Sequence, residues 1–124
     1  MWIFTQDGYI SAVAKGPADK PIVARARDRQ SLEVLADMAD AEIEFTPLAD
    51  YQYRVYVTRD MLTEFLALSV EALDYTNFKD RIAVTRGHEF HHACGDVWVA
   101  MNEIKDDEAR EYYAERYATR RRGA

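Results

Sequence analysis

The first half of the chain alternates apolar and polar residues with the period of β-strands. Two such segments flank Asp7-Gly8, a dipeptide that tolerates the positive φ angles of a tight turn, so residues 2–14 are predicted to form a β-hairpin. A loop containing Gly16-Pro17 then interrupts the pattern. Further strands are predicted from β-branched and aromatic residues over 21–27, 42–46 and 51–58.

Elsewhere the apolar residues recur with the period of α-helices. The spacing of Leu32, Leu35, Ala36 and Ala39 predicts an amphipathic helix over residues 29–39 that lies on the sheet, with Asp28 as its N-cap. The second half of the chain is predicted to be helical, with the first of its helices capped by Asp60. These helices are predicted over about 61–73, a short stretch to about 84, 87–104 and 108–119.

This order of elements predicts an α+β domain. We expect a mainly antiparallel sheet of about five strands with helices packed chiefly on one face, and a decorated ferredoxin-like arrangement would satisfy that description. Residues 1–104 are predicted to form a single domain. Residues 105–124 are predicted to be a C-terminal helical extension with the Arg-rich tip Arg120-Arg121-Arg122.

Composition and charge restrict the possible functions. Sixteen Lys and Arg against 22 Asp and Glu give a net charge of −6, which argues against general DNA binding but permits a local basic patch. The single Cys94 cannot form an internal disulfide, and no stretch approaches the roughly 20 apolar residues that span a bilayer. The sequence therefore predicts a cytoplasmic protein without a membrane segment.

His88, Glu89 and His92 match the helical H-E-x-x-H pattern, in which two imidazoles bind zinc and the glutamate activates a water. The position where metzincins place a third histidine holds Trp98, which leaves Glu111 or Glu115 as the third ligand. Opposite the histidines runs an apolar stripe suited to core packing, and it favours solvent-facing histidines over a zinc hydrolase. The stripe consists of Phe90, Cys94, Val97, Met101 and Ile104.

Arginines lie on one alternating set of two predicted strands, with Arg25 and Arg27 on one strand and Arg54 with Tyr56 on the other. If the apolar set of both strands packs under the helices, the arginines face outward. Such a basic and aromatic face could bind a nucleotide or single-stranded RNA. The simpler alternative is a solvated strand face whose arginines pair with neighbouring carboxylates.

Several short motifs lie along roughly residues 1–104. They are Met1-Trp2-Ile3-Phe4-Thr5 with Gly8 and Ser11, Arg25-x-Arg27 followed by Leu32-Glu33-x-Leu35, Asp50-Tyr51-x-Tyr53-Arg54, Asp74-Tyr75-x-Asn77-Phe78-Lys79 and Asp96-Val97-Trp98. Together these motifs resemble a family of small uncharacterised proteins of bacteria and some of their phages. The resemblance implies no known activity and therefore no catalytic residue, and H-E-x-x-H is not obligatory in the family pattern.

The sequence therefore predicts a noncatalytic interaction or regulatory accessory protein of bacterial or phage origin, with a protein partner and no cofactor. Zinc-dependent hydrolysis and nucleotide or RNA binding are the two alternatives. The residues that would carry binding are Arg25, Arg27, Arg54 and Tyr56.

Overall fold

The computed structural model describes residues 1–123, within which five strands and five helices follow one another in the predicted order. The predicted elements are all present, with boundaries shifted by a few residues. They are β1 (Trp2–Thr5), β2 (Gly8–Ala14), β3 (Ile22–Ala26), α1 (Gln30–Ala39), β4 (Glu44–Phe45), β5 (Tyr53–Val57), α2 (Arg59–Glu71), α3 (Phe78–Arg86), α4 (His88–Met101) and α5 (Asp107–Arg122).

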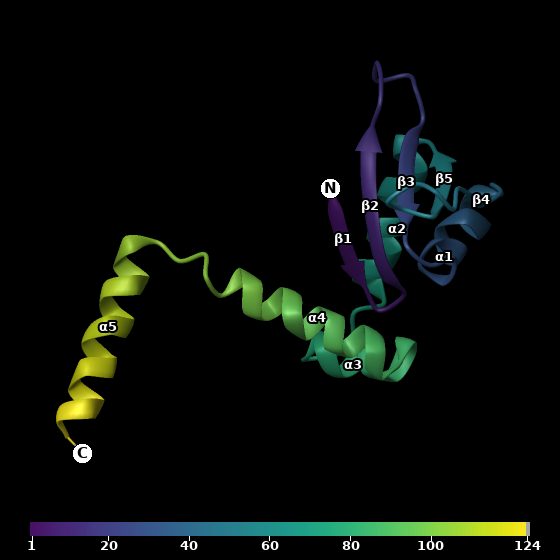
Figure 1. The fold of residues 1–124 in the computed structure, drawn as a ribbon. Helices are drawn as coiled ribbons and strands as arrows, with labels where there is room; N and C mark the ends of the chain where they lie inside the picture. Colours follow the sequence, from purple (N-terminus) through teal and green to yellow (C-terminus); the bar gives the residue numbers. More distant parts are fainter. Residues whose placement is uncertain (124) are drawn as a thin grey trace. The chain divides into compact units, whose positions relative to one another are not determined.

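The strands form one antiparallel sheet in the order β1-β2-β3-β5-β4 (Figure 1). This confirms the predicted α+β class. The part from β3 to α2 follows the β-α-β-β-α order of a ferredoxin-like motif. No strand follows α2 within residues 1–123, however, and β2 borders β3 on the outer side instead. The ferredoxin-like order is therefore present only in part.

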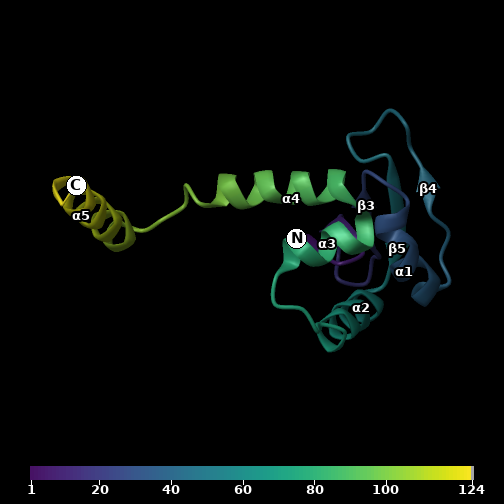
Figure 2. The ribbon, with the colours of Figure 1, turned by 90° about the horizontal axis from the view of Figure 1, so that it is seen from below.

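Helices α1 and α2 pack on the same face of the sheet. Leu35 on α1 and Phe65 on α2 are almost completely buried, and they join one core cluster with Ala24 and Val55 from the central strands. Figure 2 shows α2 on one side of the strands. Because successive side chains of a strand point to opposite faces, the predicted arginines lie on the other face of the sheet. Neither α1 nor α2 packs on that face.

The chain divides into two compact units, residues 1–91 and residues 92–124. The first unit holds the sheet, α1, α2, α3 and the first turn of α4. The second holds the rest of α4 and α5, and none of the α5 side chains is buried. Asp106 caps α5 by accepting a hydrogen bond from the backbone N–H of Ala109 at 2.8 Å.

Two helix caps differ from the prediction. Asp28 does not cap α1: its carboxylate accepts from the Ser31 hydroxyl and pairs with Arg86 of α3. Helix α2 is capped by Thr58 rather than by Asp60, since the Thr58 hydroxyl accepts from a backbone N–H at 3.1 Å. The Asp28 carboxylate, which local propensity predicts as the cap of α1, thus forms a tertiary ion pair instead.

The β1–β2 hairpin is confirmed, but its turn lies at Gln6-Asp7 and Gly8 is already the first residue of β2. The turn is held by α3. Thr85 donates a hydrogen bond to the carbonyl of Gln6 at 2.6 Å, and Arg86 donates one to the carbonyl of Asp7, also at 2.6 Å. Helix α3 thereby connects the hairpin turn to the start of α1.

Some predicted packing residues are exposed. On α4 only Cys94 is buried among the residues of the apolar stripe, and the prediction of core packing is wrong for Val97, Met101 and Ile104. On α2 the buried residues are Leu62 and Phe65, and no later residue of the helix is buried. The exposed Leu68 and Val70 of α2, with Leu73 just after the helix, line a groove of about 610 Å³ beside β1 that Val34 and Met38 of α1 also line.

Candidate functional site

The sheet face opposite α1 and α2 carries a row of polar residues across three strands. Ser11 of β2 lies opposite Arg25 of β3, and Arg25 lies opposite Arg54 of β5. Because paired residues of neighbouring strands point to the same face, the three side chains share this surface. Arg25 donates from Nη2 to the Ser11 hydroxyl at 2.8 Å, which fixes its guanidinium over β2. We call this surface, with Arg27, Tyr51 and Tyr9, the Arg–Tyr face.

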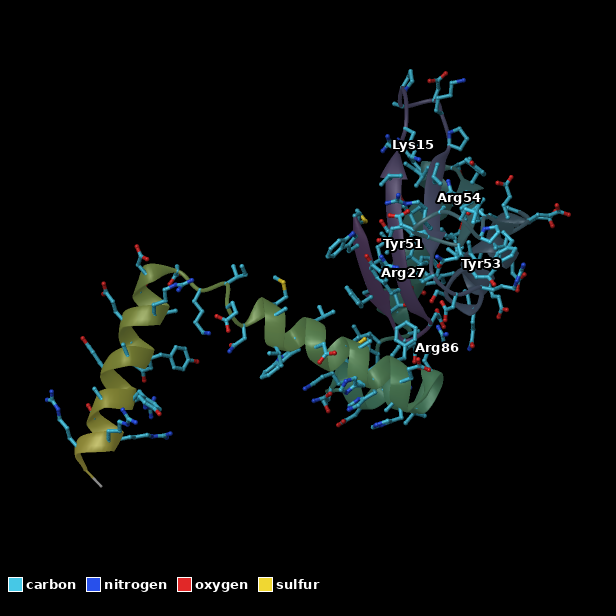
Figure 3. All side chains as sticks on the ribbon, in the orientation of Figure 1. Lys15, Arg27, Tyr51, Tyr53, Arg54 and Arg86 are labelled. Carbon is cyan, nitrogen blue, oxygen red and sulfur yellow. The ribbon has the colours of Figure 1, made fainter. Side chains whose placement is uncertain are left out.

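Tyr51, in the segment between β4 and β5, folds over the arginines and is only 6% exposed. The guanidinium carbons of Arg25 and Arg27 each lie 4.5 Å from the centre of its ring. Figure 3 shows Arg27 and Tyr51 next to each other over the strands. Stacking of this kind holds a guanidinium in place while its N–H edges stay available for hydrogen bonds. The two arginines are therefore pre-organised.

Aromatic rings continue from Tyr51 towards β1. The Tyr51 hydroxyl lies 3.1 Å from the Tyr9 hydroxyl, and the Tyr9 ring stacks on Phe4 with 4.7 Å between centroids. Trp2 meets Tyr9 edge to face at 6.0 Å and is itself 71% exposed. An exposed aromatic surface on β1 is thus continuous with the arginines of β3.

Burial and the hydrogen bond to Tyr51 raise the pKa of Tyr9 to about 12, whereas the hydrogen bond from Tyr9 lowers the pKa of Tyr51. The two phenols act as a coupled pair in which Tyr51 loses its proton first and the nearby guanidinium groups stabilise the anion. Tyr51 thus lies in a locally positive environment.

Replacing Tyr9 by Phe is expected to raise the pKa of Tyr51, because the phenolate loses the hydrogen bond that contributes most to its stabilisation. At pH 10 the ionised fraction of Tyr51 then falls. The check is an NMR titration of ¹³C-labelled tyrosine ring carbons in both proteins, with the Tyr51 signal assigned by a Tyr51→Phe variant. A Tyr51 pKa that is unchanged by Tyr9→Phe would contradict the coupling.

The arginines of this face lack acidic partners. Within residues 1–123, no carboxylate oxygen lies within 4.0 Å of Arg25, Arg27 or Arg54, although Glu44 lies opposite Arg54 in the strand register. The Nε atom of Arg54 is also buried without a hydrogen-bond partner in this part of the chain. The prediction that neighbouring carboxylates neutralise these arginines is therefore wrong, and the face holds uncompensated positive charge and an unsatisfied donor.

Of the four predicted binding residues, Arg25 and Arg54 are direct cross-strand neighbours and Arg27 joins them through Tyr51. Tyr56 lies further along β5, opposite Val23, with 45% of its surface exposed. Sequence reasoning missed the contributions of Tyr51, Tyr9, Ser11 and Trp2. The available signal was that Tyr51 precedes Arg54 by three residues in the Asp50-Tyr51-x-Tyr53-Arg54 motif. The alternation of side chains along a strand could not, however, place a loop residue over the sheet.

The H-E-x-x-H residues do not assemble a metal site. Among residues 1–123 no three His, Cys, Asp or Glu side chains are placed to hold one ion. His92 is exposed and lies 3.7 Å from the carboxylate of Asp96, one turn later on the same helix. The Nδ1 atom of the neighbouring His91 lies 2.7 Å from the backbone carbonyl oxygen of Lys79. Neither Glu111 nor Glu115 completes the set, so the structure does not support the zinc alternative.

Comparison with protein-family models, with curated proteins and with solved structures finds no match for this chain. No helix in the described part of the chain is long and apolar enough to cross a membrane.

Proposed function

We propose that this chain is a noncatalytic cytoplasmic binding protein and that the Arg–Tyr face binds a phosphate-bearing ligand. One observation carries the proposal: Arg25, Arg27 and Arg54 gather on one sheet face with no carboxylate within 4.0 Å in residues 1–123. In a chain with a net charge of −6, three uncompensated arginines on one face concentrate positive potential locally. An accessory or regulatory role in a bacterium or phage is compatible with such binding.

The chemistry of the face suits a phosphate group. A guanidinium presents several N–H donors in a rigid plane that matches two oxygens of a phosphate or a carboxylate at once. The stacking of Arg25 and Arg27 on Tyr51 lowers the entropy lost when a ligand binds. The hydroxyl of Ser11, which is 1% exposed, supports this arrangement from below by accepting a hydrogen bond from Arg25.

Pyrophosphate is the minimal probe for this proposal. We expect its addition at constant ionic strength to give saturable shifts of the Nε–Hε NMR signals of Arg25, Arg27 and Arg54. Exchanging the three for Gln is expected to weaken pyrophosphate binding at least tenfold, because each lost guanidinium removes charge-assisted hydrogen bonds worth roughly 1.5–3 kcal/mol. Dissociation constants come from the shifts of backbone amides on β3 and β5.

The matched control replaces Arg120, Arg121 and Arg122 by Gln, which changes the net charge by the same amount, from −6 to −9. This variant is expected to bind pyrophosphate as the parent protein does. Equal weakening in both triple variants would show that total charge rather than the face controls binding. Shifts of equal size at all arginines would likewise contradict a specific site.

A further inference from the structure

We infer that the phosphate-bearing ligand of the Arg–Tyr face is single-stranded nucleic acid, bound over more than one nucleotide. This inference rests on the proposed function and deepens it. It adds a second observation, the exposed aromatic side chains on the same face of the sheet as the arginines. These are Trp2 and Phe4 of β1 and, two residues beyond Arg54 on β5, Tyr56.

The strand register places base-stacking and phosphate-binding groups in one row. Trp2 lies opposite Ser11, and the row continues through Arg25 to Arg54. With neighbouring strands about 4.8 Å apart, the row extends about 14 Å from β1 to β5. Stacked nucleotides of one strand repeat about every 3.4 Å, so this distance corresponds to about four stacked nucleotides, or fewer in an extended strand. A mononucleotide is too short to reach both ends.

The exposed rings favour unpaired bases. Trp2 meets Tyr9 edge to face and is 71% exposed, so most of its ring surface is available for stacking. Bases in a duplex are already stacked and paired, so their faces are not available to aromatic side chains. The net charge of −6 also opposes a long duplex, whose phosphates would extend past the three arginines.

The competing ligand is a phosphorylated or acidic protein segment, which the arginines alone would also fit. The aromatic residues distinguish the two ligands. A phosphopeptide uses the guanidinium groups without needing flat rings on either side, whereas a nucleic acid strand presents a flat base beside each phosphate. The presence of Trp2 and Tyr56 on the same face as the arginines therefore fits a nucleic acid strand better.

The test is fluorescence anisotropy with a fluorescein-labelled 12-nucleotide strand of mixed sequence, as RNA and as DNA, against the full chain. We expect the strand to bind at least tenfold more tightly than UMP and than the same sequence as a duplex. Preference for the RNA or the DNA form then identifies which nucleic acid the site takes. Binding of the strand no tighter than that of UMP, or weaker than that of a phosphoserine peptide, would overturn the inference.

The aromatic residues are tested separately from the arginines. Trp2→Ala and Tyr56→Ala are each expected to weaken strand binding at least fivefold while leaving pyrophosphate binding unchanged, because stacking acts on bases only. The matched control is Trp98→Ala, which removes the other tryptophan, 61% exposed on α4, and is expected to leave strand binding unchanged. Circular dichroism verifies that each variant is folded.

The pyrophosphate and strand measurements together distinguish phosphate binding from nucleic acid binding. If pyrophosphate shifts the three arginines but Trp2→Ala and Tyr56→Ala bind the strand as tightly as the parent chain, the proposed function stands and the inference about nucleic acid fails. If pyrophosphate leaves the arginines unshifted, the proposed function itself fails.

Discussion

Gly8→Ala is expected to lower the free energy of unfolding by about 2–6 kcal/mol, as the sum of backbone strain and overpacking. Gly8 has a φ of +143°, where L-residues are strained. A Cβ atom at this position would lie 2.6 Å from Nη1 of Arg86 and closer still to the hydroxyl of Ser31. The substitution therefore strains the hairpin and also displaces the side chains that connect it to α1 and α3.

Urea unfolding followed by circular dichroism measures this loss. Gly95→Ala is the matched control, since Gly95 lies in α4 and a Cβ there meets no atom within 4 Å. Alanine within a helix is more stable than glycine by roughly 0.5–1 kcal/mol, so Gly95→Ala is expected to stabilise the chain or leave its stability unchanged. A loss below roughly 0.5 kcal/mol for Gly8→Ala, the usual range for surface substitutions, would refute the close approach.

Arg86→Ala is expected to lower the free energy of unfolding by about 2–4 kcal/mol, less than for a fully buried pair because the Asp28 carboxylate is partly exposed. The Arg86 side chain is 8% exposed and joins three parts of the first unit. It pairs with Asp28 and donates to the Asp7 carbonyl and, at 3.2 Å, to the Ser31 hydroxyl. Its guanidinium also lies 4.6 Å from the ring centre of Phe90.

Helix α3 supplies its own control for this prediction. Arg81 pairs with Asp74 at 2.9 Å, but the Asp74 side chain is 71% exposed, so Arg81→Ala is expected to cost at most about 1 kcal/mol. Urea midpoints measured at low and high NaCl concentration compare the two variants. Equal losses for Arg81→Ala and Arg86→Ala would contradict a special role for Arg86 in joining α3 to the hairpin.

The Arg–Tyr face was predictable in part. Alternation along β3 and β5 placed Arg25 and Arg54 on one outward face, because residues two apart on a strand point the same way. The partners of that face were not predictable. Tyr51 comes from a connecting segment, and a carboxylate such as Glu44 can lie opposite Arg54 without pairing with it. Periodicity gives the direction of a side chain but not the distance to its neighbours.

The H-E-x-x-H motif shows the opposite case, in which local spacing is correct and the implied chemistry is unsupported. His88 and His92 do lie one helical turn apart on α4. A zinc site also needs a third ligand from elsewhere in the chain, and residues 1–123 bring none to that position. Short motifs specify the residues of one element, whereas a metal centre depends on the packing of several.

The sequence by itself determined the elements and their faces: a hairpin at the start, five strands, an amphipathic α1 and a helical second half. These follow from local periodicity, which a linear pattern records directly. Only the tertiary structure decided that Asp28 pairs with Arg86 rather than capping α1, and that Tyr51 covers Arg25 and Arg27. Such contacts join residues far apart in the chain, and they depend on the register and packing that fix interatomic distances.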